Sequence, residues 1–181
     1  QLAELEDNAT RKAKYWCGVA TLQQKYMNDR FLAVRSFDNA LDADPTMLRA
    51  FEAIDQILTE DKDYERQDRY YRKMLKRAME RQLDDGLIFS LAKNLGEINR
   101  SRLQRYDEAA KAYAIALSRR PDDPGTNQIL AQLYELDEQS NLAIEQYQAL
   151  IRKDPKNIES YRSLKRLYME SDRLDEAWCV C

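Results

Sequence analysis

The sequence predicts an all-α fold built from repeated pairs of helices, and three observations support this prediction. First, the 181 residues include only four Gly and four Pro. Ala, Leu, Glu, Lys, Arg and Gln fill most of the stretches between them, which favours long helices over turn-rich β structure. Second, a hydrophobic content of 44% is enough for a substantial core. Third, similar residues recur at a fixed spacing of 34 positions.

The repeat is clearest in the C-terminal half of the chain. Residues that match at a spacing of 34 are Pro121 and Pro155, Ala109 and Ala143, Tyr113 and Tyr147, Leu130 and Leu164, Tyr134 and Tyr168, and Ala143 and Ala177. Similar residues occur 76 positions earlier in the chain. Ala33, Phe37, Ala40 and Pro45 correspond to Ala109, Tyr113, Ala116 and Pro121. Because 76 exceeds two periods by eight residues, one irregular repeat lies between. An ordinary helical bundle with accidental spacing is the alternative, and the recurrence argues against it.

Small and aromatic residues alternate in the repeat in a way that suits packed helix pairs. A small side chain lets two antiparallel helices approach closely, and an aromatic ring fills the gap between neighbouring pairs. Proline moves the preceding residue away from the helical region, so Pro45, Pro121 and Pro155 are expected to separate successive pairs. The small positions are Ala33, Gly96, Ala109, Ala131 and Ala143, and the aromatic ones are Phe37, Tyr113, Tyr134, Tyr147 and Tyr168.

This pattern resembles the tetratricopeptide repeat (TPR), whose first helix carries Leu-Gly/Ala between two aromatics and whose second helix carries Ala-x-x-x-aromatic before a proline. The best match is Leu130-Ala131, Tyr134, Ala143, Tyr147 and Pro155, with Asn127 replacing the leading aromatic. In the preceding repeat, Asn99 stands where tyrosine is usual. The loop from Arg100 to Arg105 has one residue more than the pattern expects. The resemblance implies a right-handed α-solenoid of stacked antiparallel helix pairs, a TPR-like superhelix.

The resemblance also divides the chain into a lead-in and an array. Residues 1–13 are expected to form a helical lead-in, and residues 14–181 the TPR-like array. The repeats span about 14–47, 48–85, 86–123 and 124–157, with a partial repeat at 158–181. The irregular second repeat has no closing proline, and its second helix, Tyr64 to Gln82, is expected to be about two turns longer than its neighbours.

The C-terminal end of the array is predicted to lack a polar cap. The sequence stops where a second helix is half complete, and it leaves an apolar stub of Leu174, Ala177, Trp178, Val180 and Cys181. A helix pair cannot bury its apolar face alone. We therefore expect either that the parent protein continues past residue 181 or that this end docks on another molecule.

The sequence offers no catalytic constellation. Histidine is absent, which removes Ser-His and Cys-His nucleophile pairs, histidine metal ligands and the usual general base near neutral pH. The four glycines, at 18, 86, 96 and 125, are too far apart for a phosphate-binding loop. We expect no enzyme activity, no cofactor and no metal.

Cysteines and paired carboxylates are interpreted as structural. Cys179 and Cys181 form a Cys-x-Cys pair without a second pair of ligands, so these two residues and Cys17 are predicted to act as small buried hydrophobes. Asp84-Asp85 and Asp122-Asp123 flank repeat boundaries, where short acidic side chains cap helix N-termini.

Charge and hydropathy exclude several classes of partner. The 29 basic and 32 acidic residues give a net charge of −3 and are interleaved, which does not provide the basic surface that nucleic acid needs. No apolar run is long enough to span a membrane. Three cysteines are too few for a disulfide framework and favour a reducing compartment, so the cytoplasm is expected. The helix from Tyr64 to Gln82 carries seven basic residues, interpreted as a solvated face, with docking of an anionic partner as the alternative: Arg66, Arg69, Arg72, Lys73, Lys76, Arg77 and Arg81.

The TPR resemblance places partner-binding residues on the concave face, which the first helices line. Helical spacing selects polar first-helix residues there: Arg49, Glu52, Gln56, Lys93, Asn94, Glu97, Gln128, Gln132, Arg162 and Arg166. Lys93, Arg162 and Arg166 favour a partner with an acidic segment. The Lys and Asn clamp of some TPR proteins is not predicted, because Gly18 and Leu22 occupy the corresponding places in the first repeat.

The predicted function is therefore a non-catalytic scaffold that binds a peptide or helix of a partner protein in its concave groove. It is expected to be a segment of a larger repeat protein. The alternative is a structural module that self-associates through its exposed repeat ends, the uncapped C-terminal end included, and has no dedicated peptide groove.

Overall fold

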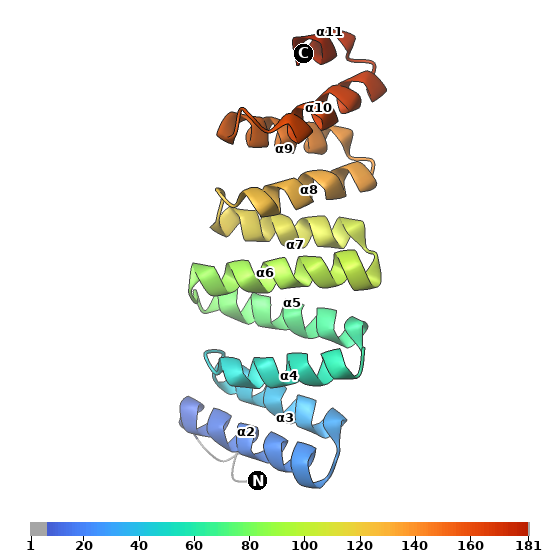
Figure 1. Cartoon of the computed structure of the whole chain (residues 1–181). Coiled ribbons are helices and arrows are strands. Elements are labelled where there is room, and N and C mark those ends of the chain that lie inside the picture. Colours follow the sequence, from blue (N-terminus) through green and yellow to red (C-terminus); the bar gives the residue numbers. More distant parts are fainter. Residues whose placement is uncertain (1–6, 181) are drawn as a thin grey trace. The chain divides into compact units, whose positions relative to one another are not determined.

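A computed structural model describes residues 7–180, and this range folds into α-helices and one π-helical turn without any strand (Figure 1). The N-terminal helices are α2 (Ala9–Tyr26), α3 (Arg30–Ala43), α4 (Leu48–Glu60) and α5 (Tyr64–Glu80). They are followed by α6 (Asp85–Ile98), the π-helical turn η1 (Asn99–Leu103), α7 (Tyr106–Arg119), α8 (Pro124–Leu136), α9 (Ser140–Lys153), α10 (Ile158–Glu170) and α11 (Leu174–Cys179). The all-α prediction is confirmed.

The chain forms two compact units, and their boundary falls inside α6, between Leu91 and Ala92. Each unit is a stack of antiparallel helix pairs in which consecutive helices pack side by side. Of the expected lead-in, residues 1–6 lie outside the described range, and the residues from Ala9 onward form the first turns of α2.

The core of unit 1 is assembled around α3, which packs against both α2 and α4. Small residues such as Ala20 of α2 and Ala33 of α3 are fully buried, and Phe37 of α3 is also buried. Further along, the rings of Phe51 and Tyr71 meet edge to face, with centroids 4.9 Å apart and planes at 79°.

The core of unit 2 repeats the same combination of small and aromatic residues. Ala109, Ala131 and Ala143 are fully buried, and the rings of Tyr113 and Tyr147 lie beside them. The small residues bring the helices together and the rings fill the interfaces between pairs, as the repeat pattern predicts.

The turns between helix pairs contain the predicted prolines and capping residues. Pro45, Pro121 and Pro155 each lie between the second helix of one pair and the first helix of the next. Asp84 accepts a hydrogen bond from the Leu87 amide at the start of α6, and Asp123 accepts one from the Thr126 amide in α8. These carboxylates cap helix N-termini, as predicted.

The irregular second repeat departs from the prediction. Helix α5 has 17 residues against 14 in α3, so it is about one turn longer rather than two. It ends early because Gln82 adopts a left-handed conformation with φ of 50°, and the Leu83 amide then donates back to the Ala78 carbonyl. This turn replaces the missing proline.

The extra residue predicted between Arg100 and Arg105 is taken up by η1. There the Arg105 amide donates to the Asn99 carbonyl at 2.8 Å, and Gln104 is left-handed with φ of 54°. A π-helical turn absorbs one additional residue without ending the helix, so α7 still begins in register.

Candidate partner-binding groove

A partly apolar hollow of unit 1 lies between α2 and α4, with α3 beneath it. Its volume is about 540 Å³. It is lined by Lys14, Cys17, Thr21 and Gln24 of α2, Phe37 of α3, and Met47, Arg49, Ala50 and Ala53 at and after the start of α4. We call this hollow the α2–α4 groove.

Helical periodicity explains how the groove is built. The α2 residues that line it, from Lys14 to Gln24, are spaced by three, four and three positions, so they form one row along the helix. Arg49, Ala50 and Ala53 lie in the first two turns of α4 and face this row. Since α3 packs on both helices, its Phe37 closes the bottom of the groove.

The floor of the groove is apolar. Phe37 and Ala50 are buried, and the Cys17 Sγ lies 3.1 Å from the Met47 Sδ. Burial raises the pKa of the Cys17 thiol above its usual value, which keeps the sulfur protonated and unreactive at neutral pH. Cys17, which is predicted to act as a small buried hydrophobe, is half-buried in the floor of the groove.

The rim of the groove is polar, and the charged residues that line it within residues 7–180 are positive. Lys14 and Arg49 are exposed, and within residues 7–180 neither forms an ion pair. None of the described residues that line the groove carries a carboxylate. The Thr21 hydroxyl donates to the Cys17 carbonyl at 2.9 Å, while the exposed Gln24 amide keeps donors and acceptors for a partner. A segment with an apolar side chain and a carboxylate suits such a site.

The predicted site residues of unit 1 lie on α4. Arg49 lines the groove, and Glu52 is exposed one turn further along. The Gln56 amide donates to Glu60 at 3.0 Å on the same helix. Arg49 is therefore the one predicted residue that the structure places in the α2–α4 groove.

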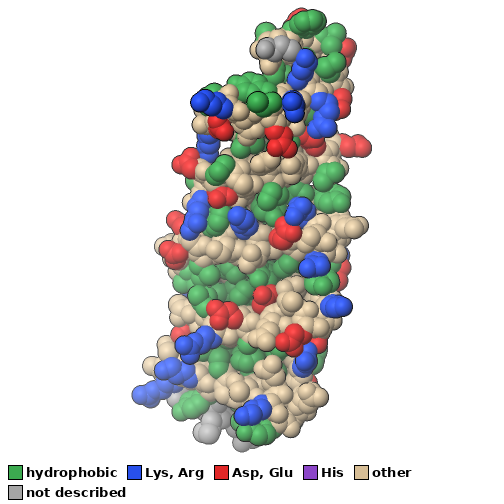
Figure 2. Space-filling model, in the orientation of Figure 1, with side chains coloured by type: hydrophobic (Ala, Val, Ile, Leu, Met, Phe, Trp, Pro, Cys, Tyr) green, Lys and Arg blue, Asp and Glu red, His purple; other side chains and the backbone are tan. Residues whose placement is uncertain are grey.

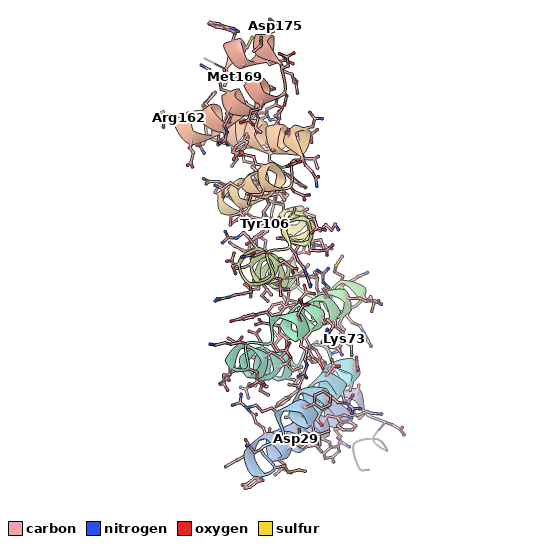
Figure 3. The ribbon with its side chains drawn as sticks, turned by 90° about the vertical axis from the view of Figure 1, so that its right-hand side faces the viewer. Asp29, Lys73, Tyr106, Arg162, Met169 and Asp175 are labelled. Atoms are coloured by element: carbon pink, nitrogen blue, oxygen red, sulfur yellow. The ribbon has the colours of Figure 1, made fainter. Side chains whose placement is uncertain are left out.

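The predicted site residues of unit 2 are largely engaged with their neighbours. Lys93 Nζ lies 3.9 Å from Asp123, Gln128 donates to Glu159 at 3.3 Å, and Arg166 contacts Glu135. These contacts join one first helix to the next. Asn94, Gln132 and Arg162 remain exposed, and Figure 3 shows Arg162 on α10.

Glu97 is also engaged. It accepts hydrogen bonds from Arg100 at 2.9 Å and from the Tyr113 hydroxyl at 3.0 Å. Burial acts to raise the pKa of Glu97, but the bonds from Arg100 and Tyr113 outweigh it and hold the pKa below its usual range. The carboxylate therefore orients side chains of its own unit.

The residues that sequence reasoning missed are Lys14, Cys17, Thr21 and Gln24. Their three-four-three spacing along α2 is the signal that could have identified them. The distance between α2 and α4, which opens the groove, has no signature in the sequence.

The basic helix α5 is bound to its own unit more than the sequence indicates. Lys73 Nζ lies 2.7 Å from Asp38, and Arg77 pairs with both Asp38, at 2.6 Å, and Asp42. Only 9% of the Arg77 side chain is exposed, so its interpretation as part of a solvated face was wrong. The reason is that α3 presents two carboxylates, one turn apart, to α5. Elsewhere acidic and basic side chains are interspersed over the visible surface (Figure 2).

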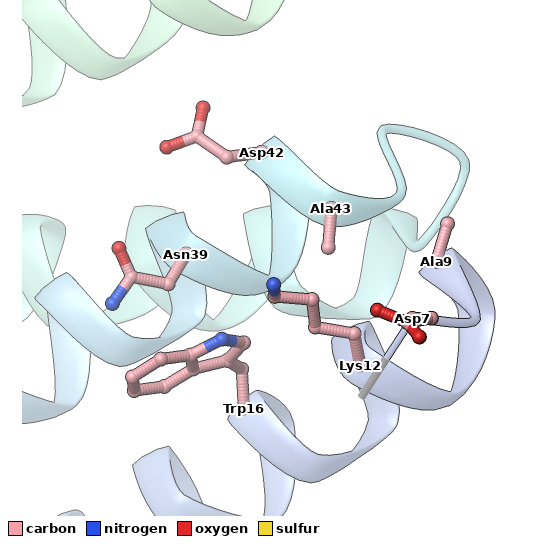
Figure 4. Close-up of a pocket in the computed structure, with 7 residues that line it drawn as sticks. All are labelled: Asp7, Ala9, Lys12, Trp16, Asn39, Asp42 and Ala43. Atoms are coloured by element: carbon pink, nitrogen blue, oxygen red, sulfur yellow. The ribbon is translucent and has the colours of Figure 1, made fainter. Parts of the chain in front are cut away.

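A second hollow of unit 1, of about 560 Å³, lies between the N-terminal half of α2 and the C-terminal half of α3 (Figure 4). Lys12 and Trp16 face Asn39 there, with Asp7 and Asp42 at its edges. Charges of both signs line it, and Asp42 is already paired with Arg77. This hollow therefore shows no preference for one kind of ligand.

The C-terminal end of unit 2 carries a smaller apolar hollow of about 310 Å³. It is lined by Lys165 and Met169 of α10 and by Leu174, Ala177 and Trp178 of α11. The Trp178 side chain is 78% exposed, and Figure 3 shows Met169 beside α11. Cys179 is exposed, so its predicted burial was wrong, because no further helix covers α11 among the described residues; Cys181 lies outside them.

Within residues 7–180, no group of three or more Cys, Asp or Glu side chains is arranged to hold a metal ion. In the same range, no helix combines the length and the apolar character that crossing a membrane requires.

The fold is that of TPR proteins, as comparison with solved structures shows. YrrB, a TPR protein with an unusual peptide-binding site, superposes with a TM-score of 0.55 at 16% identity, over 95% of this chain and 80% of its own. MamA from Desulfovibrio magneticus RS-1 gives 0.53 at 18% identity, over 97% and 92%. The Naa15/Naa10 complex bound to HypK-THB gives 0.63 at 16% identity, over 93% of this chain and 24% of the matched chain. No protein-family model and no curated protein matches the sequence.

Proposed function

We propose that this chain is a non-catalytic scaffold that binds an extended segment of a partner protein in the α2–α4 groove. The observation that carries the proposal is the groove itself, with an apolar floor at Phe37 and Met47 and an uncompensated positive rim at Lys14 and Arg49. The TPR-like fold supports it, since YrrB is a TPR protein with a peptide-binding site.

The groove favours an acidic partner. A carboxylate at the rim can accept a charge-assisted hydrogen bond from Lys14 or Arg49, and a neighbouring apolar side chain can pack against Phe37. We therefore propose that the acidic segment expected in the partner binds to unit 1. In unit 2, by contrast, Lys93 and Arg166 already face carboxylates of their own chain.

Selection from a display library of short linear peptides tests this function. Peptides that bind the wild type should be enriched in Asp or Glu next to an apolar residue. Replacing Lys14 and Arg49 with Ser should weaken their binding about tenfold or more, because both charged partners are lost. The matched control replaces Arg35 and Arg69, two exposed arginines on the second helices, with Ser and should bind as the wild type does. Peptides without acidic residues, or equal loss in both variants, would contradict the proposal.

A second candidate function is self-association through the repeat end. The apolar hollow beside Trp178, with Met169 and Leu174 also more than half exposed, favours it. Sedimentation over a wide range of protein concentrations should then show a dimer that Trp178→Gln abolishes. A mass that stays monomeric at every concentration would reject this second function and leave the first untouched.

A further inference from the structure

Helix α2 presents a second surface, next to the row of residues that lines the α2–α4 groove. Tyr15, Leu22 and Tyr26 are 47%, 56% and 72% exposed. With Gly18 they follow a three-four-four spacing, which places all four on one side of the helix. The groove residues Cys17 and Thr21 lie on a different side of α2. We call the row of Tyr15, Gly18, Leu22 and Tyr26 the α2 outer stripe.

The outer stripe is unusual because three large apolar side chains on one helix face are exposed together. Single exposed hydrophobic residues are common, but a contiguous row marks an interaction surface more often than not. The row covers 11 residue steps, or about 16 Å of helix. That length suits two to three turns of a helix lying alongside it.

Gly18 provides an independent indication of a partner. Glycine is less favourable than alanine in a helix interior. Among the described residues, a Cβ built at Gly18 meets no heavy atom within 4 Å beyond its own stretch of helix. Packing within the chain therefore does not require the glycine. What it creates is an indentation between Tyr15 and Leu22, where another backbone or a large side chain can approach closely.

The charge of α2 specifies the chemistry of the occupant. Between Ala9 and Tyr26 the helix carries four basic residues and no acidic one. Arg11 and Lys25 lie in the same row as Gly18 and Leu22, at its two ends. The nearest following carboxylate, Asp29, is committed to capping α3. A docked helix with carboxylates beside its apolar face would be attracted along the whole length of α2.

We propose that the α2 outer stripe docks an acidic amphipathic helix of a partner protein, which places a large apolar side chain over Gly18. The helix lies between Tyr15 and Tyr26 and sets its carboxylates against Arg11 and Lys25. This surface is additional to the α2–α4 groove, and a partner can use either or both.

A display library of helical peptides, with randomised residues on all faces, tests the proposal. Binders should carry a net negative charge and apolar residues spaced by three or four positions. Gly18→Leu fills the indentation and should weaken their binding about tenfold or more. Since leucine is a better helix former than glycine, the same variant should melt at a higher temperature, which excludes misfolding as the cause.

Two further variants separate this site from the other possibilities. Arg49→Ser alters only the α2–α4 groove and should leave the selected helices bound; loss of binding there would move them to the groove and overturn the proposal. Leu22→Lys should abolish binding. If Leu22→Lys instead dissolves a concentration-dependent dimer of the wild type, the occupant is a second copy of this chain. The proposal would also be overturned if Gly18→Leu bound the selected helices as the wild type does, or if the selected helices lacked the acidic pattern.

Discussion

Gly96 packs directly beneath the ring of Tyr113, the residue that follows one helix later in the same repeat. A Cβ at position 96 would lie 2.7 Å from both Cδ2 and Cε2 of that ring, well inside van der Waals contact. The Tyr113 side chain is almost fully buried and its hydroxyl is fixed by Glu97, so the ring has no room to retreat.

Gly96→Ala should therefore destabilise the protein, although alanine is the better helix former. Overpacking of this kind costs about 1–3 kcal/mol, which exceeds the gain in helix propensity. Gly18→Ala is the matched control, because Gly18 stands in open space and its replacement should stabilise by up to about 1 kcal/mol. Urea unfolding of the two variants should show shifts of opposite sign, and shifts of the same sign would refute the packing argument.

Tyr147→Ala should lower the free energy of unfolding by about 3–5 kcal/mol, because it opens a cavity inside the cluster with Leu164 and Tyr168. Burial raises the pKa of the Tyr147 hydroxyl to about 12, so the residue is neutral in this cluster. Tyr147→Phe keeps the ring and should cost only about 1 kcal/mol. Denaturant titration measures both, and equal losses would show that the hydroxyl rather than the ring matters.

The ion pairs between α3 and α5 should make part of the stability depend on pH. Burial acts to raise the pKa of Asp42, but its hydrogen bond to Arg77 and the nearby charges of Arg77 and Lys73 outweigh burial and lower it. A depressed carboxyl pKa contributes stability above the ordinary value of about 4. That contribution is lost as the pH falls through the pKa of the folded state.

Wild-type protein should therefore lose stability more steeply than Arg77→Met on acidification from about pH 5 to pH 2. Lys76→Met is the control, since Lys76 is exposed and, among the described residues, pairs only with Glu80, at 3.7 Å. Thermal melts across this pH range make the comparison. Parallel curves for wild type and Arg77→Met would show that the pair does not set the acid response.

Glu138→Gly should stabilise the turn between α8 and α9. Glu138 has φ of 57°, a left-handed conformation that strains every residue with a Cβ. Glycine removes that strain, so we expect a gain of up to about 1 kcal/mol and a higher melting temperature. Glu138→Ala retains the Cβ and should give no such gain; if both variants behave alike, the strain is not the cause.

Much of the fold could be predicted from the sequence because the repeat encodes local packing. Ala131 and Ala143 mark where two helices touch, and Pro155 marks where the next pair begins. These signals act over a few turns of helix, so a fixed period reveals them. The length of α5 was overestimated because the left-handed turn at Gln82 carries no glycine or proline.

The candidate site was less accessible to prediction. Helical spacing selected Arg49, which lines the α2–α4 groove, but could not show that Glu97 and Arg166 contact side chains of other segments. Such pairs depend on the distance between helices and on rotamers, which the period does not record. The same limit hid Cys17 and Gln24, whose role follows only from the gap between α2 and α4.

Within each unit, the helices whose backbones approach closely are neighbours in sequence, from α2 and α3 to α10 and α11. Closing such contacts requires only short loops, and chains with this topology fold in microseconds to milliseconds. Because these close approaches join only neighbouring helices among the described residues, local opening within a unit can begin at one helix pair and spread stepwise. A partner that covers α2 would therefore slow amide hydrogen exchange most in that helix and progressively less in the helices stacked behind it.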